Sequence, residues 1–293
     1  MSELKQRQAS YEHPWLYHRY AYDERARHRG VEAACLAHLA GRDTLHLVDC
    51  GAGNGANLRY FFPKIAQRQH WTLVEQDPKL LAGVRQWLAD WGAMQGWQWE
   101  VTVSDHTTRL HTEALTVSLC EASLLDVAAL VPMDTVDLLL ANAVFDLFTE
   151  AQFDDFAGQL AGVPLLATLN YCGMTFSPTD GYDRLVVGYY EAHMNRPQPA
   201  GRAMGKYGPL RMADVLARHD YTVHRGDSVW QVGAQDQEMM TYLLGFMEEA
   251  VPELPLDAGS LERFGQWVAR QRLAVADGRL ALDVYHEDLF ACR

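Results

Sequence analysis

Cysteine, positive charge and long apolar runs are all scarce in this sequence. The five cysteines are scattered and form no CxxC pair, so they indicate neither a disulfide framework nor a zinc site. That usage is typical of a reducing cytoplasm, where we expect the protein to work. No window approaches the ~20 apolar residues of a membrane helix, and the polar N-terminus lacks the apolar core of a secretory signal. We therefore expect no membrane partner.

The charge balance is acidic. The chain has 25 Lys and Arg against 38 Asp and Glu, which gives a net charge of −13. Proteins that bind DNA or RNA normally present a basic surface, so we expect no nucleic acid partner. No cluster of histidine, cysteine or carboxylate has the spacing of metal ligands, and no metal is expected. With 293 residues, 48% of them hydrophobic, the chain is long enough to bury a full core without covalent cross-links.

Strand-like and helix-like stretches alternate along most of the chain, which predicts an α/β fold with a parallel sheet. The expected strands are residues 44–48, 71–75, 100–104, 115–120, 136–141, 165–170, 221–228 and 280–285. The expected helices are residues 15–39, 56–66, 79–91, 212–219, 237–250 and 261–276. We expect residues 1–43 to form an N-terminal helical cap on a domain of residues 44–293. Two helices inserted at about 235–277 precede the last strand, and the whole is expected to form one structural unit.

The strongest motif is a glycine-rich turn between a strand and a helix, in HLVDCGAGNGANLRYF. Gly51, Gly53 and Gly55 let the backbone turn tightly and approach a ligand closely. The helix start beyond them offers free N–H groups. Glu75 follows about 20 residues later, at the expected end of the second strand, where a carboxylate can accept both hydroxyls of a ribose. The turn and the acid together predict a cofactor that carries a nucleoside.

Asp49 separates two cofactor classes that use this layout. Dinucleotide enzymes use G-x-G-x-x-G/A, which Gly51, Gly53 and Ala56 satisfy formally. S-adenosylmethionine enzymes carry an acid two residues before the first glycine, which is the position of Asp49. A carboxylate there suits a positively charged amine and would repel a pyrophosphate. The sequence therefore favours S-adenosyl-L-methionine as the cofactor.

With Glu75 and the downstream segment VDLLLANAVFDLF, these motifs resemble the class I S-adenosylmethionine-dependent methyltransferases over nearly the whole chain. The similarity is greatest to an uncharacterised bacterial subgroup, on the segments WLYHRYAYDERAR, NLRYF, ANAVFDLF, SPTDGYD and EAHMNR. The resemblance implies a Rossmann-like, mostly parallel sheet of seven strands in the order 3-2-1-4-5-7-6, with the last strand antiparallel. It also implies methyl transfer to an acceptor.

The resemblance assigns cofactor contacts to the ends of the strands. Asp49 and the backbone of Gly51 would hold the methionine amine, Glu75 the ribose, and Gln76 would lie beside the adenine. Asn142, after the fourth strand, would line the sulfonium. The cofactor-binding turn as a whole would comprise Gly51, Ala52, Gly53, Asn54 and Gly55.

The adenine contact after the third strand is open in register, in the segment CEASLLD. Such families usually place an acid and a backbone N–H there. Glu121, or Ser123 with Leu124, fits that place, and so does Asp126 if the strand runs longer. Ser123 and Leu124 are preferred.

Three charged residues share one face of the N-terminal helix. Arg19, Asp23 and Arg27 recur at i, i+4 and i+8. Since an arginine fork suits a carboxylate, Arg19 is expected to meet the carboxylate of the cofactor, and Arg27 to meet substrate or Asp23. The alternative is a solvated salt-bridge face.

Three residues are candidates for the chemistry at the acceptor. Asp146, four residues past Asn142, is expected to serve as a general base, or else as a helix N-cap or a surface acid. Tyr171 follows the fifth strand, and ligands bind at the carboxyl ends of such strands. His193 is a base or a substrate hydrogen-bond partner, or else a packed or surface histidine. The turn-rich residues 173–183 are expected to form a lid or wall.

The function that follows is methyl transfer from S-adenosyl-L-methionine to a small molecule, by in-line displacement at the sulfonium. A cofactor-binding module without catalysis and an NAD-dependent oxidoreductase are the alternatives. The tryptophans in residues 87–99 are expected to pack in the core, and a homodimer through their exposed parts stays open.

Overall fold

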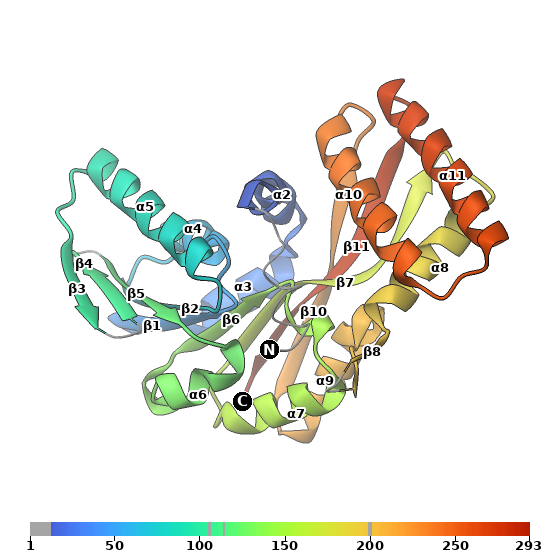
Figure 1. Ribbon diagram of the computed structural model, residues 1–293. Coiled ribbons are helices and arrows are strands. Elements are labelled where there is room, and N and C mark those ends of the chain that lie inside the picture. The colour runs from blue at the N-terminus through green and yellow to red at the C-terminus, as the bar shows by residue number, and fades with distance from the viewer. Residues whose placement is uncertain (1–12, 105–106, 114, 199–200) are drawn as a thin grey trace.

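The computed structural model describes residues 13–104, 107–113, 115–198 and 201–293. Residues 1–12 of the expected N-terminal cap therefore lie outside the described part. Nine described strands form one sheet in the order β10-β11-β7-β6-β1-β2-β5-β4-β3 (Figure 1). Their bounds are β1 Thr44–Cys50, β2 Arg68–Glu75, β3 Glu100–Ser104, β4 Thr107–His111, β5 Leu115–Glu121, β6 Leu138–Asn142, β7 Leu165–Ser177, β10 Thr222–Val232 and β11 Ala281–Cys292. Two short strands, β8 Pro197–Gln198 and β9 Gly201–Arg202, pair separately.

The expected strand order is confirmed in seven consecutive strands of the sheet, from β5 to the edge strand β10, but the expected total of seven is wrong. Read from β5 to β10, the sheet runs 3-2-1-4-5-7-6 once β3 and β4 are left out, and β11 is antiparallel to both its neighbours. The hairpin of β3 and β4 adds two strands beside β5. Residues 107–111 were not expected to be a strand, because Leu110 is their one buried side chain and leaves no clear period-2 pattern.

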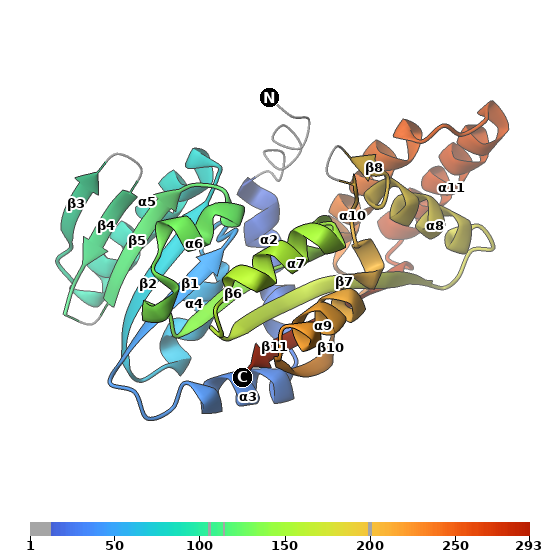
Figure 2. The same ribbon diagram turned by 90° about the horizontal axis from the view of Figure 1, so that it is seen from below.

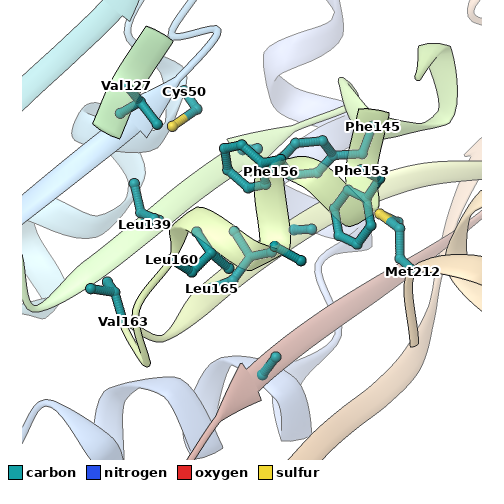
Figure 3. Close-up of a cluster of buried hydrophobic side chains, with 14 of the residues drawn as sticks. Cys50, Val127, Leu139, Phe145, Phe153, Phe156, Leu160, Val163, Leu165 and Met212 are labelled. Atoms are coloured by element: carbon teal, nitrogen blue, oxygen red, sulfur yellow. The ribbon is translucent and has the colours of Figure 1, made fainter. Parts of the chain in front are cut away.

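Helices cover both faces of the sheet. On one face lie α3 (Arg29–His38), α4 (Ala56–Phe61) and α5 (Pro78–Gln95), and on the other α6 (Val127–Leu130), α7 (Glu150–Gln159) and α9 (Gly208–Arg218). The core between the sheet and α6, α7 and α9, the second core, is rich in aromatic rings. Phe145, Phe153 and Phe156 pack against one another there, with Met212 beside them (Figure 3). The four tryptophans of residues 87–99 pack against the first core, which lies between the sheet and α3, α4 and α5, as expected.

The expected helix over residues 15–39 is wrong in one respect, since it breaks in two. Helix α2 spans His13–Ala26, and α3 begins at Arg29. Between them His28 caps α3: its Nδ1 accepts the N–H of Val31 at 3.2 Å, while its own N–H donates to Asp288 Oδ2 at 2.8 Å. The break depends on Asp288, 260 residues away, so local sequence could not predict it.

A third core lies beyond the carboxyl ends of the central strands. Because Asn142 of β6 pairs with Thr168 of β7, all of β7 after Thr168 extends past β6. The extensions of β7, β10 and β11 pack against α2, α8 (Asp183–Met194), α10 (Gln237–Ala250) and α11 (Ala258–Ala276), as Figures 1 and 2 show. Residues 173–177 are thus strand, and the expected loop over 173–183 is wrong for them, because pairing with β11 extends β7.

The two inserted helices lie where they were expected, between β10 and β11. No helix in the described part of the chain is both long and apolar enough to span a membrane.

Candidate functional site

The glycine-rich turn lies at the carboxyl end of β1, against β2. Gly51, Gly53 and Gly55 have φ of 71°, 54° and 77°, a region in which side chains with a Cβ are strained. The N–H groups of Gly51 and Ala52 donate to the carbonyl of Val74 at 2.8 and 3.1 Å. A Cβ on Gly51 would lie 3.0 Å from Val144, and one on Gly53 would lie 3.5 Å from Leu16 of α2. The turn is therefore enclosed by β2, by the loop after β6 and by α2.

Glu75 holds the turn against the end of β2. Its two carboxylate oxygens accept the N–H of Gly53 at 2.9 Å and the N–H of Asp77 at 3.0 Å. The side chain is half-buried. Gln76, which follows it, is also half-buried. A carboxylate thus lies at the place where the sequence predicts a ribose contact.

Asp49 is buried at the end of β1, with 1% of its surface exposed. Its Oδ1 accepts a hydrogen bond from Nδ2 of Asn57 at 2.8 Å. Burial raises the pKa of the Asp49 carboxyl to about 7, while the Asn57 hydrogen bond and the Arg27 charge act in the opposite direction. The carboxyl can therefore change charge near neutral pH and favours a cationic neighbour.

Arg27 is linked to Asp49 by hydrogen bonds through Asn57. Its Nη2 donates to Asn57 Oδ1 at 2.6 Å and its Nη1 to Thr168 Oγ1 at 3.3 Å. The guanidinium also lies over the ring of Tyr60, 4.3 Å from the centroid. The structure therefore places the Arg27 side chain in a buried hydrogen-bond network, and only the backbone N–H of Arg27 contacts Asp23, at its carbonyl oxygen.

Arg19 makes a fork with Asp23. Its Nε and Nη2 donate to the carboxylate at 3.1 to 3.3 Å, and the guanidinium lies 4.9 Å from the ring centroid of Trp230. The expected i,i+4 pair exists, but its alternative interpretation as a solvated face is wrong, because the side chains are only 14% and 4% exposed.

Asn142 joins these two arginines. Its Nδ2 donates to Asp23 Oδ2 at 3.3 Å, and its Oδ1 accepts from Thr168 Oγ1 at 3.3 Å. Together with the contacts above, this makes one continuous chain of hydrogen bonds across the strand ends. Its members are Arg19, Asp23, Asn142, Thr168, Arg27, Asn57 and Asp49. Helix α2 is thereby linked to the carboxyl ends of β1 and β6 and to Thr168 within β7.

The candidate adenine-binding residues of the segment CEASLLD differ in burial and in distance from the glycine turn. Leu124 reaches the turn, since its Cδ2 lies 3.6 Å from where a Cβ on Gly51 would be. Ser123 is half-buried, and its Oγ accepts the N–H of Leu125 at 3.2 Å. Glu121 and Asp126 are exposed. Leu124 is thus brought beside the glycine turn.

Among the buried polar atoms without a hydrogen-bond partner in the described part of the chain, two belong to Asn54 and Asp146. Asn54 is buried, and its Nδ2 has no hydrogen-bond partner. Asp146, in the short turn η4 (Phe145–Leu147), is also buried, and its Oδ1 has none. Burial raises the pKa of Asp146 to about 6, and the charge of Arg19 opposes that rise. A buried, unpaired carboxylate oxygen calls for a hydrogen-bond donor from outside the protein.

Tyr171 lies in the extension of β7, and burial raises its pKa. Its hydroxyl donates to Glu191 Oε1 at 3.5 Å, and Lys206 donates to the other oxygen of Glu191 at 2.5 Å. His193, two residues along α8, bonds instead to Glu253 at 2.9 Å and to Arg196. Within the described residues, His193 makes no hydrogen bond to Asp146 or Tyr171.

His286 of β11 lies beside Tyr171 and Trp230. It is buried, which lowers its pKa to about 3, so the ring is neutral at physiological pH. The ring lies 4.8 Å from that of Trp230 and 6.3 Å from that of Tyr171. No group of three or more His, Cys, Asp or Glu in the described residues is arranged to hold a metal ion.

Asn57 and Thr168 were missed by sequence reasoning. The sequence did contain one signal for Asn57. Its polar amide is the second residue of a helix that continues as LRYF, so it stands out on an apolar face. Thr168 gave no such signal, since a threonine is ordinary in a strand.

No protein-family profile matches the sequence, and neither does any curated protein. Solved structures of similar shape include a cyclopropane synthase from Mycobacterium tuberculosis, with 14% identity, a TM-score of 0.45 and coverage of 89% of this chain and 82% of that one. The YcgJ protein from Bacillus subtilis has 11% identity, a TM-score of 0.46 and coverage of 90% and 97%. A phosphoethanolamine N-methyltransferase from Haemonchus contortus, solved with S-adenosyl-L-methionine, has 11% identity, a TM-score of 0.41 and coverage of 90% and 52%. Likeness at this level assigns no activity to the present chain.

Proposed function

We propose that this protein binds S-adenosyl-L-methionine and transfers its methyl group to a small-molecule acceptor. The observation that carries the proposal is the buried carboxyl of Asp49, at the end of β1 and directly before a glycine turn that Glu75 braces. A buried carboxyl beside backbone that only glycine tolerates fits a ligand with a cationic amine at one end and a ribose at the other.

The same observations count against a dinucleotide. A pyrophosphate would need the N-terminus of α4, and α4 has only six residues, so its dipole is modest. Asp49, next to the turn, would repel its two negative charges, whereas a ribose-binding acid such as Glu75 is compatible with either cofactor. An NAD-dependent oxidoreductase is therefore the weaker candidate.

Each cofactor contact falls to a residue of this chain. Asp49 binds the amine, Glu75 the ribose hydroxyls, and Leu124 packs beside the adenine. Arg19 leaves one edge of its fork for the carboxylate of the methionine moiety. The bound cofactor supplies a methyl group on a positively charged sulfur.

The acceptor side is formed by Asp146, Tyr171, Glu191 and Lys206. Asp146 has a buried carboxylate oxygen without a donor, so it orients an acceptor N–H or O–H and takes its proton. The Glu191–Lys206 pair holds the Tyr171 hydroxyl in place on the neighbouring side. The hydrogen bonds and the neutral His286 ring favour a small polar acceptor, and the net charge of −13 disfavours a nucleic acid.

The test is methyl transfer from methyl-labelled S-adenosyl-L-methionine to a pool of small metabolites, with Asp146→Asn as the control. We expect a labelled product from the wild type and a large loss of label with the variant. Cofactor binding without transfer to any compound would favour the non-catalytic module. Absence of cofactor binding would contradict the proposal itself.

A further inference from the structure

Strand β3 is an unprotected edge of the sheet. All five of its residues are exposed, and among the described elements β4 alone packs extensively against it. In both ribbon views β3 forms the outer margin of the sheet (Figures 1 and 2). Edge strands are commonly protected by lysine, proline or a bulge. β3 has no lysine or proline, and it pairs with β4 without a bulge from Glu100 to Ser104.

One side of β3 is apolar and uncovered. Val101 lies opposite the buried Leu110 of β4, so it is on the α5 side of the sheet, and Val103 follows on the same side. Val101 is 49% exposed, Val103 66% and Met94, near the end of α5, 76%. The apolar layer under α5 therefore remains open at this edge.

We propose that a second copy of this chain pairs with β3 in antiparallel orientation, around a two-fold axis beside Thr102. In that register Val101 faces Val103 of the second copy, and Thr102 faces its own equivalent. Directly opposite residues of an antiparallel pair share one face of the sheet, so four valines form one row under both copies of α5. The surface is self-complementary, as a two-fold interface requires.

Charge also selects this edge for self-association. Two chains that each carry −13 repel one another over most of their surface. The described residues of β3 and β4 contain one acid, Glu100, and one base, Arg109. In the proposed register Glu100 faces Ser104 of the second copy, so no like charges meet across the axis.

Light scattering of the full chain after size exclusion tests the proposal. We expect the wild type at twice the 33.1 kDa of one chain. Val103→Lys should return it to one chain, because a lysine on the edge cannot be covered. Leu273→Lys is the matched control, since Leu273 is 64% exposed on α11 at the other end of the molecule, and it should leave the dimer intact.

Two single-cysteine variants, Thr102→Cys and Ser104→Cys, test the register of the strand pairing without a substitution at Val103. Facing Cα atoms in antiparallel strands are ~4.5–5.5 Å apart, within reach of a disulfide. Thr102→Cys should therefore give a covalent dimer on mild oxidation, and Ser104→Cys should not. A monomeric wild type would overturn the proposal and leave the edge to a strand of another protein. A dimer that survives Val103→Lys, or one cross-linked by Ser104→Cys alone, would also overturn it.

Discussion

The guanidinium of Arg27 donates to Oδ1 of Asn57 at 2.6 Å, and this contact fixes which end of the Asn57 amide faces Asp49. With its oxygen engaged by Arg27, Asn57 turns its NH₂ toward Asp49 and donates to the carboxyl at 2.8 Å. A residue at the α2–α3 junction thus orients the acid that we assign to the cofactor amine.

Replacing Arg27 tests this orientation. Arg27→Met keeps much of the buried volume but leaves Asn57 Oδ1 and Thr168 Oγ1 without their donor. We expect a loss of ~1–3 kcal/mol in the free energy of unfolding, together with weaker binding of S-adenosylhomocysteine. Urea denaturation and calorimetry measure the two effects. Arg270→Met, which breaks an exposed pair with Asp180, is the control and should cost less than ~1 kcal/mol. Equal effects from both variants would contradict the role of Arg27.

The pH dependence of cofactor binding follows from Asp49. Its pKa is raised to about 7, so the carboxyl is mostly neutral below that pH and attracts an ammonium group poorly. The affinity for S-adenosylhomocysteine should therefore rise as pH increases from ~5.5 through 7. Because a bound ammonium favours the anionic form, binding at pH 6 should also release protons.

Calorimetry in buffers of different ionisation enthalpy measures that proton release. Asp49→Asn should abolish it and flatten the pH profile, because the amide does not titrate. An unchanged profile in the variant would show that another group titrates.

The fold was largely predictable because most of it follows local rules. For example, the apolar run that ends at Asp49 predicts the end of β1, and Gly51 after it predicts a turn. Both patterns can be recognised without knowing the tertiary contacts. The break at His28 and the extension of β7 were not predictable, because each involves a contact with a distant segment. Strand β4 pairs with its neighbours in sequence, but it was missed because its residues lack a clear alternation of buried and exposed side chains.

The candidate site divides in the same way. Asp49 and Glu75 could be placed from spacing alone, and they lie at adjacent strand ends. The partner of the Arg27 side chain could not be predicted in this way. Its spacing from Asp23 suggested an i,i+4 pair on one helix, but α2 ends at Ala26 and the Arg27 side chain binds Asn57 instead. Spacing along one helix cannot anticipate such a helix end.

Asp146 should control the acidic limb of the rate profile. Its pKa of about 6 predicts that kcat rises with pH through 6 as the carboxyl becomes able to accept a proton. Asp146→Asn should lower kcat by ~10²-fold or more and remove that limb. Its affinity for S-adenosylhomocysteine should stay within about twofold of the wild type. A variant that keeps the acidic limb would show that the base is elsewhere.

The aromatic core behind Asp146 should dominate the stability of this face. Phe153 is fully buried, with its ring 5.0 Å from that of Phe145 (Figure 3). Phe153→Ala should lower the free energy of unfolding by ~3–5 kcal/mol. Leu273→Ala, at an exposed position, should change it by less than ~0.5 kcal/mol. A small effect at Phe153 would mean that the core collapses to fill the cavity.

The measurement that tests the central claim most directly is calorimetric titration of the wild type and Asp49→Asn with S-adenosyl-L-methionine, S-adenosylhomocysteine and NAD⁺ in parallel. We predict micromolar binding of the first two to the wild type, none of NAD⁺, and a loss of ~2–3 kcal/mol in the variant. Binding of NAD⁺ alone, or equal affinity of both proteins for S-adenosylhomocysteine, would contradict the assignment of Asp49 to the cofactor amine.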